Sequence, residues 1–316
     1  MQKAFLLVAL LAFFSNTVSE QVQIRELTQG ICKFSADIYE QCAQSEADGN
    51  MVFSPFSMSM LLTLLSQGTN GKTFDKLRKG LYLSDNKSIT ADQYHELDQL
   101  IRKSAGESEL SIANRIYVKR GLQLNEDFRT IAVEKFASDI ESVNFIQSNE
   151  TAQLINRFVE QKTKRKIKNF VKPNMFNDMT RVFLVNAIYL KSKWRYAFKR
   201  YQPWKIKFYF NETDSIWVDS LHMIKMDFNF GYLEELDAKG LEIAYGNSNF
   251  TFLIILPNNR TGLNALEVQL KNYNLSTVFD HLQITKIDVE IPKFRVETEI
   301  QMIDILKNVI LISNVK

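Results

Sequence analysis

The chain has 316 residues, of which 45% are hydrophobic and 24% charged, and this composition is typical of folded globular proteins. Its net charge is only +3 and its basic residues are scattered, which argues against nucleic acid as the main partner. With 11 glycines and 5 prolines, it has no long flexible linker and no low-complexity tract.

The first 19 residues are typical of a secretory signal peptide. Lys3 gives a short basic start, residues 4–14 form an unbroken apolar run, and small, mostly polar residues follow as far as Ser19. A membrane anchor is the alternative, but a bilayer core needs roughly 20 apolar residues and this run is much shorter. We therefore expect cleavage after Ser19, secretion to the extracellular space, no membrane partner, and a folded domain over residues 20–316.

Asn-x-Ser/Thr tripeptides, the acceptors of N-linked glycans, agree with export. Those in polar or turn-like stretches are the expected glycosylation sites: Asn86, Asn149, Asn211, Asn259 and Asn274. Asn249 also heads such a tripeptide, but it opens an apolar, strand-like run, so we expect it to be poorly accessible.

Cys32 and Cys42 are the only cysteines, which excludes a small fold stapled by disulfides. If both lie on one helix, a rise of about 1.5 Å per residue separates them by roughly 15 Å. A disulfide tolerates less than about 7 Å between Cα atoms. We therefore expect two free thiols, partly buried in an N-terminal helix.

The first part of the chain predicts helices. Apolar spacing indicates an amphipathic helix over residues 23–44, and a short strand is expected at 51–53. Ser54-Pro55 then suits the start of a buried helix that ends at Gly68, because the hydroxyl can cap the helix and proline fits its first position. Two further helices are expected over residues 73–81 and 91–103.

From Leu110 the hydrophobic period changes to two, which predicts a strand as far as Val118. Helical patterns return over residues 126–136 and 151–170. Residues 182–190 form an apolar run broken only by Asn186, as in a strand covered on both faces. Further strands are expected over residues 204–210, 250–256 and 287–291. Helices followed by strands with interspersed helices predict an α+β fold.

Ordered sequence blocks share the patterns of one known family. In residues 54–73, a Ser-Pro pair opens a helix that leads to a Gly-x-x-Gly-x-Thr turn. In residues 182–198, Val-Asn-Ala-Ile-Tyr-Leu-Lys-Ser-x-Trp is similar to the serpin pattern Val-Asn-Ala-Ile-Tyr-Phe-Lys-Gly-x-Trp. The remaining blocks lie at 110–128, 155–171, 252–259 and 289–299. Together they resemble the serpin family over roughly residues 24–300.

A few positions depart from the family's pattern. Phe158 stands where serpins usually have Trp, Ser192 where they have Gly, and Ser220-Leu221 where a Met-Met pair is common. These changes roughly keep size and polarity, so we interpret them as drift within one fold.

The resemblance implies a serpin fold, with N-terminal helices and a large central mixed sheet. It also implies inhibition of a serine endopeptidase by a suicide-substrate mechanism. In that mechanism the protease cleaves an exposed reactive-centre loop, which inserts into the sheet as a new strand and traps the acyl-enzyme. The implied partner is a serine protease of the extracellular space.

The end of the chain departs from this pattern. Serpins continue well beyond the block at Pro292-Lys293-Phe294 with the reactive-centre loop and final strands, whereas only 22 residues follow Phe294 here. Residues 306–316 match nothing expected in the family. We therefore expect an incomplete serpin domain that cannot inhibit by itself. Three alternatives stay open: a fragment of a longer inhibitory serpin, a non-inhibitory secreted binding protein, and a chain that folds poorly.

By resemblance, Ser54, Ser57 and Asn186 belong to the shutter, the polar cluster beneath the place where the main sheet parts. The family's histidine partner for that cluster lies beyond residue 316, so the amide of Asn186 is expected to be under-satisfied. Trp194 belongs to the breach, where an inserting loop first enters. From the residues alone, Asn186 is a core amide with its hydrogen bonds satisfied, and Trp194 is a large core aromatic.

A basic run near the end of the expected helix 151–170 is a candidate polyanion site, since some serpins bind heparin-like chains. It consists of Lys162, Lys164, Arg165, Lys166 and Lys168. A solvated helix face that complements the C-terminal helix dipole is the interpretation that we favour.

Enzyme functions are not indicated. His95, His222 and His281 are isolated and have no metal-ligand neighbour at helical spacing, so neither a metal nor a cofactor is expected. The sequence also lacks a Gly-x-Ser-x-Gly nucleophile elbow and a phosphate-binding glycine loop.

Overall fold

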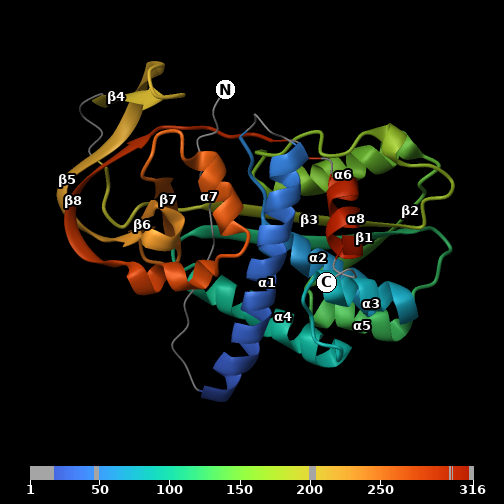
Figure 1. Cartoon of the computed structure of the whole chain (residues 1–316). Coiled ribbons are helices and arrows are strands. Elements are labelled where there is room, and N and C mark those ends of the chain that lie inside the picture. Colours follow the sequence, from blue (N-terminus) through green and yellow to red (C-terminus); the bar gives the residue numbers. More distant parts are fainter. Residues whose placement is uncertain (1–17, 46–49, 199–203, 299, 301, 313–316) are drawn as a thin grey trace. The chain divides into compact units, whose positions relative to one another are not determined.

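The computed structural model describes residues 18–45, 50–198, 204–298, 300 and 302–312 (Figure 1). The predicted signal peptide therefore lies outside the described residues, except for Val18 and Ser19. The chain forms two compact units. The first unit is built mainly from Cys32–Phe53 and Ser192–Val309, and the second mainly from Ser54–Lys191.

The N-terminal helix α1 (Val18–Ser45) confirms the predicted helix and begins five residues earlier than expected. In the first unit its buried side includes Phe34, Ile38 and Cys42. Cys32 and Cys42 are free thiols, as predicted. Burial raises the pKa of the Cys32 thiol, so this side chain stays protonated at neutral pH.

The helices of the second unit follow the predicted pattern closely. They are α2 (Pro55–Gln67), α3 (Gly71–Gly80), α4 (Lys87–Ser104), α5 (Glu126–Glu134), α6 (Ser148–Lys162) and the 3-10 helix η1 (Pro173–Met175). The side chain of Ser54 caps α2 by accepting a hydrogen bond from the Ser57 N–H at 3.3 Å, and Pro55 takes the first helical position.

The strand predicted at 51–53 is wrong. These residues precede α2 without joining a sheet among the described residues. An apolar triplet favours extended backbone, but it becomes a strand only where a neighbouring strand can take up its backbone hydrogen bonds.

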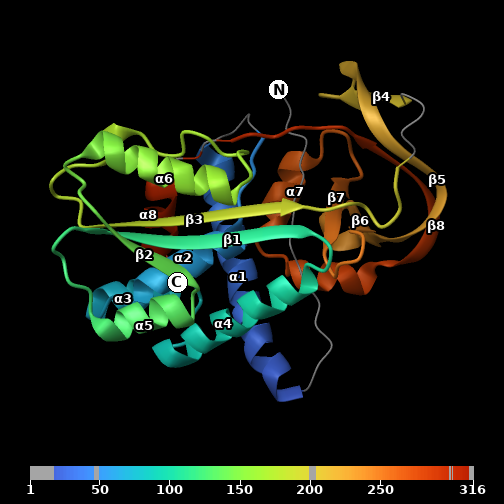
Figure 2. The same cartoon turned by 180° about the vertical axis from the view of Figure 1, so that it is seen from behind.

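The second unit contains a three-stranded sheet in the order β2-β1-β3. Strands β1 (Glu109–Lys119) and β3 (Val182–Lys191) are antiparallel and were both predicted. Strand β2 (Ser138–Val143) runs parallel to β1 and was not predicted. Helix α6 lies over one face of β1 and β3, with α2 on the other face (Figure 2). Helices therefore lie on both faces of β3, as its apolar run predicted, but only Val185 and Ala187 are buried and Asn186 is half-buried.

Helix α6 ends at Lys162, whereas the predicted helix 151–170 ends eight residues later. Lys164 and Arg165 adopt left-handed backbone conformations, with φ of 51° and 60°, which a continuing right-handed helix cannot contain. The chain then returns to α6, where the Asn156 side chain donates to the Val171 carbonyl at 3.0 Å and accepts from its N–H at 2.9 Å.

The first unit contains a five-stranded antiparallel sheet in the order β4-β5-β6-β7, with β8 paired to β5. Strands β4 (Trp204–Tyr209), β7 (Thr251–Pro257) and β8 (Gln283–Pro292) were predicted, whereas β5 (Ser215–Leu233) and β6 (Ala238–Ala244) were not. The other elements are η2 (Glu234–Leu236), α7 (Leu263–Leu270), η3 (Leu275–His281) and α8 (Met302–Ile312).

The core of the first unit joins this sheet to its helices. Leu253 and Ile255 of β7 pack with Leu266 of α7 and Val278 of η3. Helix α1 is tied to the α7 region by two polar contacts: Tyr39 donates to Glu267 at 2.5 Å, and Lys271 pairs with Glu40 at 2.6 Å.

Candidate functional site

A row of polar side chains crosses the three-stranded sheet of the second unit. Asn114 of β1 stands directly opposite Asn186 of β3, and on its other side it stands opposite Ser138 of β2. Residues opposite each other in a sheet point to the same face, so these three side chains form one line. We call Asn186, Asn114 and Ser138 the polar row.

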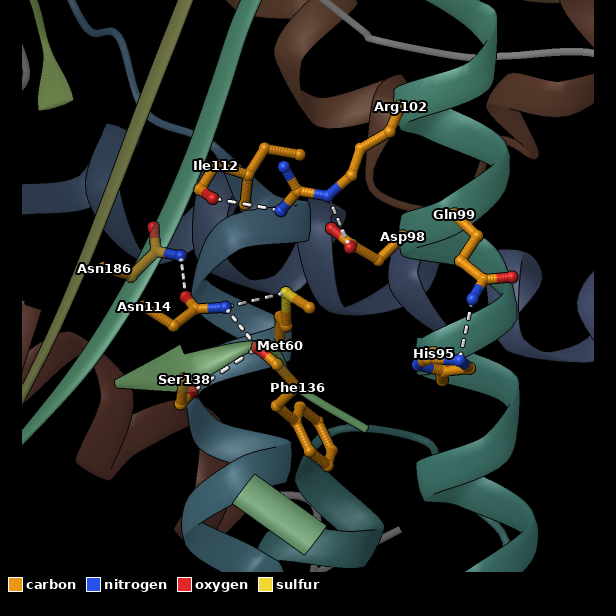
Figure 3. Close-up of polar contacts among 10 residues, drawn as sticks. All are labelled: Met60, His95, Asp98, Gln99, Arg102, Ile112, Asn114, Phe136, Ser138 and Asn186. Carbon is orange, nitrogen blue, oxygen red and sulfur yellow. Dashed lines mark hydrogen bonds and ion pairs between the residues drawn. The ribbon is translucent and has the colours of Figure 1, made fainter. Parts of the chain in front are cut away.

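Hydrogen bonds connect the polar row to the structure beneath it (Figure 3). The Asn186 Nδ2 donates to the Asn114 Oδ1 at 2.5 Å, and the Asn114 Nδ2 donates to the Phe136 carbonyl at 2.9 Å. The Ser138 hydroxyl reaches the same carbonyl at 3.4 Å, and the Met60 sulfur lies 3.5 Å from the Asn114 Nδ2. Asn114 is only 3% exposed, so both ends of its amide depend on these partners.

The floor of the site is aromatic. The Phe136 ring stacks on the ring of Tyr94 from α4 with centroids 5.9 Å apart, and both side chains are fully buried. Burial raises the pKa of Tyr94 to about 12, which keeps the phenol neutral. The site therefore rests on rigid, uncharged packing.

Helix α4 is fixed to β1 beside the polar row. The Arg102 guanidinium contacts the Asp98 carboxylate at 2.7 Å and donates to the Ile112 carbonyl at 3.0 Å (Figure 3). His95 and Gln99, one turn away on α4, lie 2.8 Å apart through their side-chain nitrogens.

The opposite face of the sheet carries charge. Arg115 pairs with Glu141 at 2.7 Å and with Asp139 at 2.9 Å, both from β2, and its guanidinium carbon lies 4.0 Å from the Phe158 ring centroid on α6. Because these ion pairs join neighbouring strands beneath a helix, they hold β2 in register with β1.

The shutter residues expected from the family do not form one hydrogen-bonded set. Asn186 bonds to Asn114, while the Ser54 hydroxyl caps its own helix. Ser57 is buried, and among the described residues no hydrogen bond joins either serine to Asn186. The facing strand supplies a partner for the Asn186 Nδ2. That the amide as a whole is under-satisfied stays a prediction.

Asn114 is the site residue that the sequence analysis missed. It breaks the apolar pattern of β1 as Asn186 breaks that of β3, and two such interruptions in neighbouring strands were the available signal. Ser138 could not be found in this way, because β2 was not predicted.

Strand β3 is an outer strand of its sheet, because among the described residues it pairs only with β1. Its second edge carries backbone N–H and C=O groups that a further strand could bind. The site thus combines an open strand edge with a hydrogen-bonded polar row, an arrangement suited to receiving an extended peptide.

Trp194 belongs to the first unit and forms an isolated bridge with Tyr245. Its ring stacks on Tyr245 at 4.8 Å between centroids and contacts Phe198 and Phe252 edge-on. This agrees with a large aromatic of the core. A role in the entry of an inserting loop stays a prediction.

Most of the basic run lies in the turn after α6 and not on a helix face, which corrects the favoured interpretation. Lys162 is helical and half-buried, while the other four cations are exposed. We call Lys164, Arg165, Lys166 and Lys168 the basic turn. Within the described part of the chain, no ion pair involves their side chains.

The candidate glycosylation sites are accessible. Asn86, Asn149, Asn259 and Asn274 are exposed, and Asn211 is partly exposed. Asn249 is exposed as well, because it lies in the turn between β6 and β7 and precedes the first paired residue of β7. The expectation that Asn249 is poorly accessible is therefore wrong.

A protein-family model described as "Serpin (serine protease inhibitor)" matches residues 29–311. The chain belongs to the serpin family. This is a family of protease inhibitors whose targets are serine proteases, and its members are generally not enzymes. The match includes residues 306–311, so the expectation that nothing there fits a serpin is wrong for these residues.

Similar proteins agree with this serpin assignment. Alaserpin of Manduca sexta is 34% identical, over 87% of this chain and 70% of that protein. Antitrypsin of Bombyx mori is 29% identical, over 89% of this chain and 71% of that protein. The solved structure of cleaved Serpin 42Da matches with a TM-score of 0.86 at 30% identity, over 90% of this chain and 76% of that one. The α+β serpin fold expected from the sequence is confirmed.

No helix among the described residues is long and apolar enough to cross a membrane. Nor do the described residues contain a cluster of three or more His, Cys, Asp or Glu side chains that could hold a metal ion.

Proposed function

We propose that this serpin is secreted and glycosylated, and that its domain serves the inhibition of an extracellular serine endopeptidase by the suicide-substrate mechanism. The open edge of β3 beside the polar row carries the proposal, because an inserted strand needs an edge with free backbone groups. Relatives named antitrypsin and leukocyte elastase inhibitor support an inhibitory lineage.

The mechanism also needs a loop that a protease can cleave. We identify no reactive-centre loop within these 316 residues, so we propose that they do not trap a protease by themselves. Inhibition then requires the same residues joined to a loop and its following strands.

This proposal predicts different outcomes for two polypeptides. The 316 residues alone, incubated with trypsin, chymotrypsin or elastase, should give no SDS-stable adduct. A chimera that continues these residues with the C-terminal part of alaserpin should give a covalent adduct with a protease, detected on denaturing gels and by mass spectrometry. Cleavage of the folded chimera without an adduct would refute the proposed mechanism, and an adduct with the 316 residues alone would refute the need for an added loop.

A non-inhibitory function as a polyanion-binding protein is the second candidate. The basic turn favours it, since its four exposed cations lie within five residues, and the left-handed backbone of Lys164 and Arg165 ends α6 at this point. A sulfated polysaccharide could bind here with release of its counterions, so binding should weaken as salt rises.

The second candidate predicts that replacing the four basic-turn cations by alanine lowers the salt concentration needed to elute the protein from immobilised heparin. A matched control replaces Lys72, Lys76, Lys79 and Lys103, which are also exposed, and so removes the same charge elsewhere. If both variants elute alike, binding depends on overall charge and the basic turn is not a site.

A further inference from the structure

An exposed aromatic face lies on the two-stranded ribbon formed by β4 and the start of β5. Opposite pairs on this face are Lys205 with Asp219, Lys207 with Trp217, and Tyr209 with Ser215. We call these six residues the Trp217 face. Trp217 is 63% exposed, so its ring offers apolar surface on which another group can pack.

Cations already contact the aromatic rings of this face. The Lys207 Nζ lies 5.7 Å from the Trp217 ring centroid, and the Arg260 guanidinium carbon lies 3.8 Å from that of Tyr209. Arg260 comes from the turn that follows β7, so this turn lies against the end of the ribbon. Figure 1 shows β4 beside the start of β5.

Two glycosylation tripeptides meet at this point. Glu212 is the middle residue of the tripeptide at 211–213 and Arg260 of the one at 259–261, and the Arg260 Nη1 donates to the Glu212 carbonyl at 3.5 Å. This contact places Asn211 and Asn259 at the same end of the ribbon, although 48 residues separate them in sequence.

Both asparagines adopt the same local geometry. The Asn211 Oδ1 accepts from the Thr213 N–H at 2.9 Å and hydroxyl at 3.3 Å. The Asn259 Oδ1 accepts from the Thr261 N–H at 3.0 Å and hydroxyl at 3.1 Å. With Oδ1 occupied in this way, the amide nitrogen Nδ2, which a glycan would modify, lies on the other side of each carboxamide.

We propose that N-linked glycans on Asn211 and Asn259 cover the Trp217 face. This inference rests on the secretion and glycosylation stated in the proposed function, and it adds the surface that the glycans occupy. A pyranose ring has a face of C–H groups that packs on an aromatic ring, and burying Trp217 in this way removes apolar surface from water. The sugar hydroxyls can hydrogen-bond to the charged ends of Lys205, Lys207 and Asp219.

The modification uses a lipid-linked oligosaccharide pyrophosphate of the secretory pathway as donor. The bond between the sugar C1 and the pyrophosphate oxygen breaks, and its electron pair leaves with the lipid pyrophosphate. A bond forms between C1 and Nδ2, which loses one proton and keeps one N–H. The remaining N–H on Asn211 is sufficient for its hydrogen bond to Asp214, which measures 2.8 Å.

The test uses the whole chain, produced by a secreting cell, with mass spectrometry to establish occupancy of both asparagines. Acrylamide quenching of tryptophan fluorescence then measures access to Trp217. We expect quenching to increase when the N-glycans are removed enzymatically from the folded protein. In W217F that increase should be absent, because the other two tryptophans lie outside the Trp217 face.

Variants separate the two sites from glycosylation in general. The double variant N211Q/N259Q should show the higher quenching before any enzyme is added, and its Tm should fall by about 2 °C. In the control N274Q, which removes a tripeptide next to η3, the quenching of Trp217 should not change.

Each remaining outcome overturns the inference in a distinguishable way. Two outcomes refute only the proposal that glycans cover the Trp217 face: secreted protein in which Asn211 and Asn259 are unmodified, and modified protein whose tryptophan quenching does not change when the glycans are removed. Both leave the proposed secretion standing. Protein retained in the cell and unmodified refutes secretion as well. The assay for a protease adduct tests the proposed inhibition separately, because it depends neither on glycan occupancy nor on tryptophan quenching.

Discussion

Replacing Gly231 by alanine is expected to lower the free energy of unfolding by about 3 kcal/mol, at the upper end of the usual cost of overpacking a core. Gly231 lies in β5, opposite Gly240 of β6. A Cβ atom at position 231 would lie 2.0 Å from the His281 carbonyl oxygen and 2.9 Å from its carbon. Because both atoms belong to the backbone of η3, no side-chain rotation can relieve the contact.

The measurement is the urea midpoint of the 316-residue chain at an unchanged m-value. Gly246→Ala is the matched control, since its Cβ would meet nothing nearer than the Lys193 carbonyl oxygen at 3.5 Å, an ordinary contact distance. Equal midpoints for G231A and G246A would mean that η3 does not lie against β5 as closely as the structure indicates.

The strands that the sequence predicted are those with a regular pattern of apolar residues along their length. In β1 the apolar residues Leu110, Ile112, Ile116 and Val118 follow a period of two, and β3 is an apolar run broken only by Asn186, so each is recognisable without its neighbours. In β2, by contrast, only Ile140 and Val143 are apolar. It becomes a strand because β1 offers a parallel edge, a long-range condition that no local pattern expresses.

Strand β5 escaped prediction for a different reason. Its pairing shifts register between Met223 and Met226, and Lys225 within that shift has a φ of 49°. An extra residue at a bulge moves the following side chains to the other face, which destroys a period of two. The early end of α6 was also hidden from the sequence. Lys164 and Arg165 adopt the left-handed conformation that ends the helix, and neither residue type favours that conformation.

The polar row could be predicted only in part, because strand register decides which polar residues stand opposite one another. Asn186 was singled out as a core amide that needs a partner, but the sequence could not say that Asn114 is the residue opposite. Ser54 and Ser57 came from the family resemblance, and in this chain the described contacts of Ser54 serve the start of α2.

Replacing Asn114 by leucine is expected to destabilise the second unit by about 2 kcal/mol, because it removes the acceptor of one amide and the shorter donor of a buried carbonyl. A buried polar group left without a partner costs about 1–3 kcal/mol. The Asn186 Nδ2 loses its acceptor, and the Phe136 carbonyl loses its shorter donor and keeps only the Ser138 hydroxyl at 3.4 Å. Leucine has the branched shape of asparagine and a larger volume, so the loss does not come from a cavity.

The double variant N114L/N186L decides whether the two amides act as a pair. If they do, removing both should cost less than the sum of the single losses, because N114L has already stranded the Asn186 amide that the second change removes. Denaturant unfolding of the parent, both single variants and the double variant gives the coupling free energy. Additive losses would mean that the hydrogen bonds of Asn114 and Asn186 form independently. The side-chain hydrogen bond between these two residues would then add nothing to the backbone pairing of β1 and β3. In that case the open edge of β3 could still pair with an inserted strand, but this pairing would not be coupled to the hydrogen bonds of the polar row.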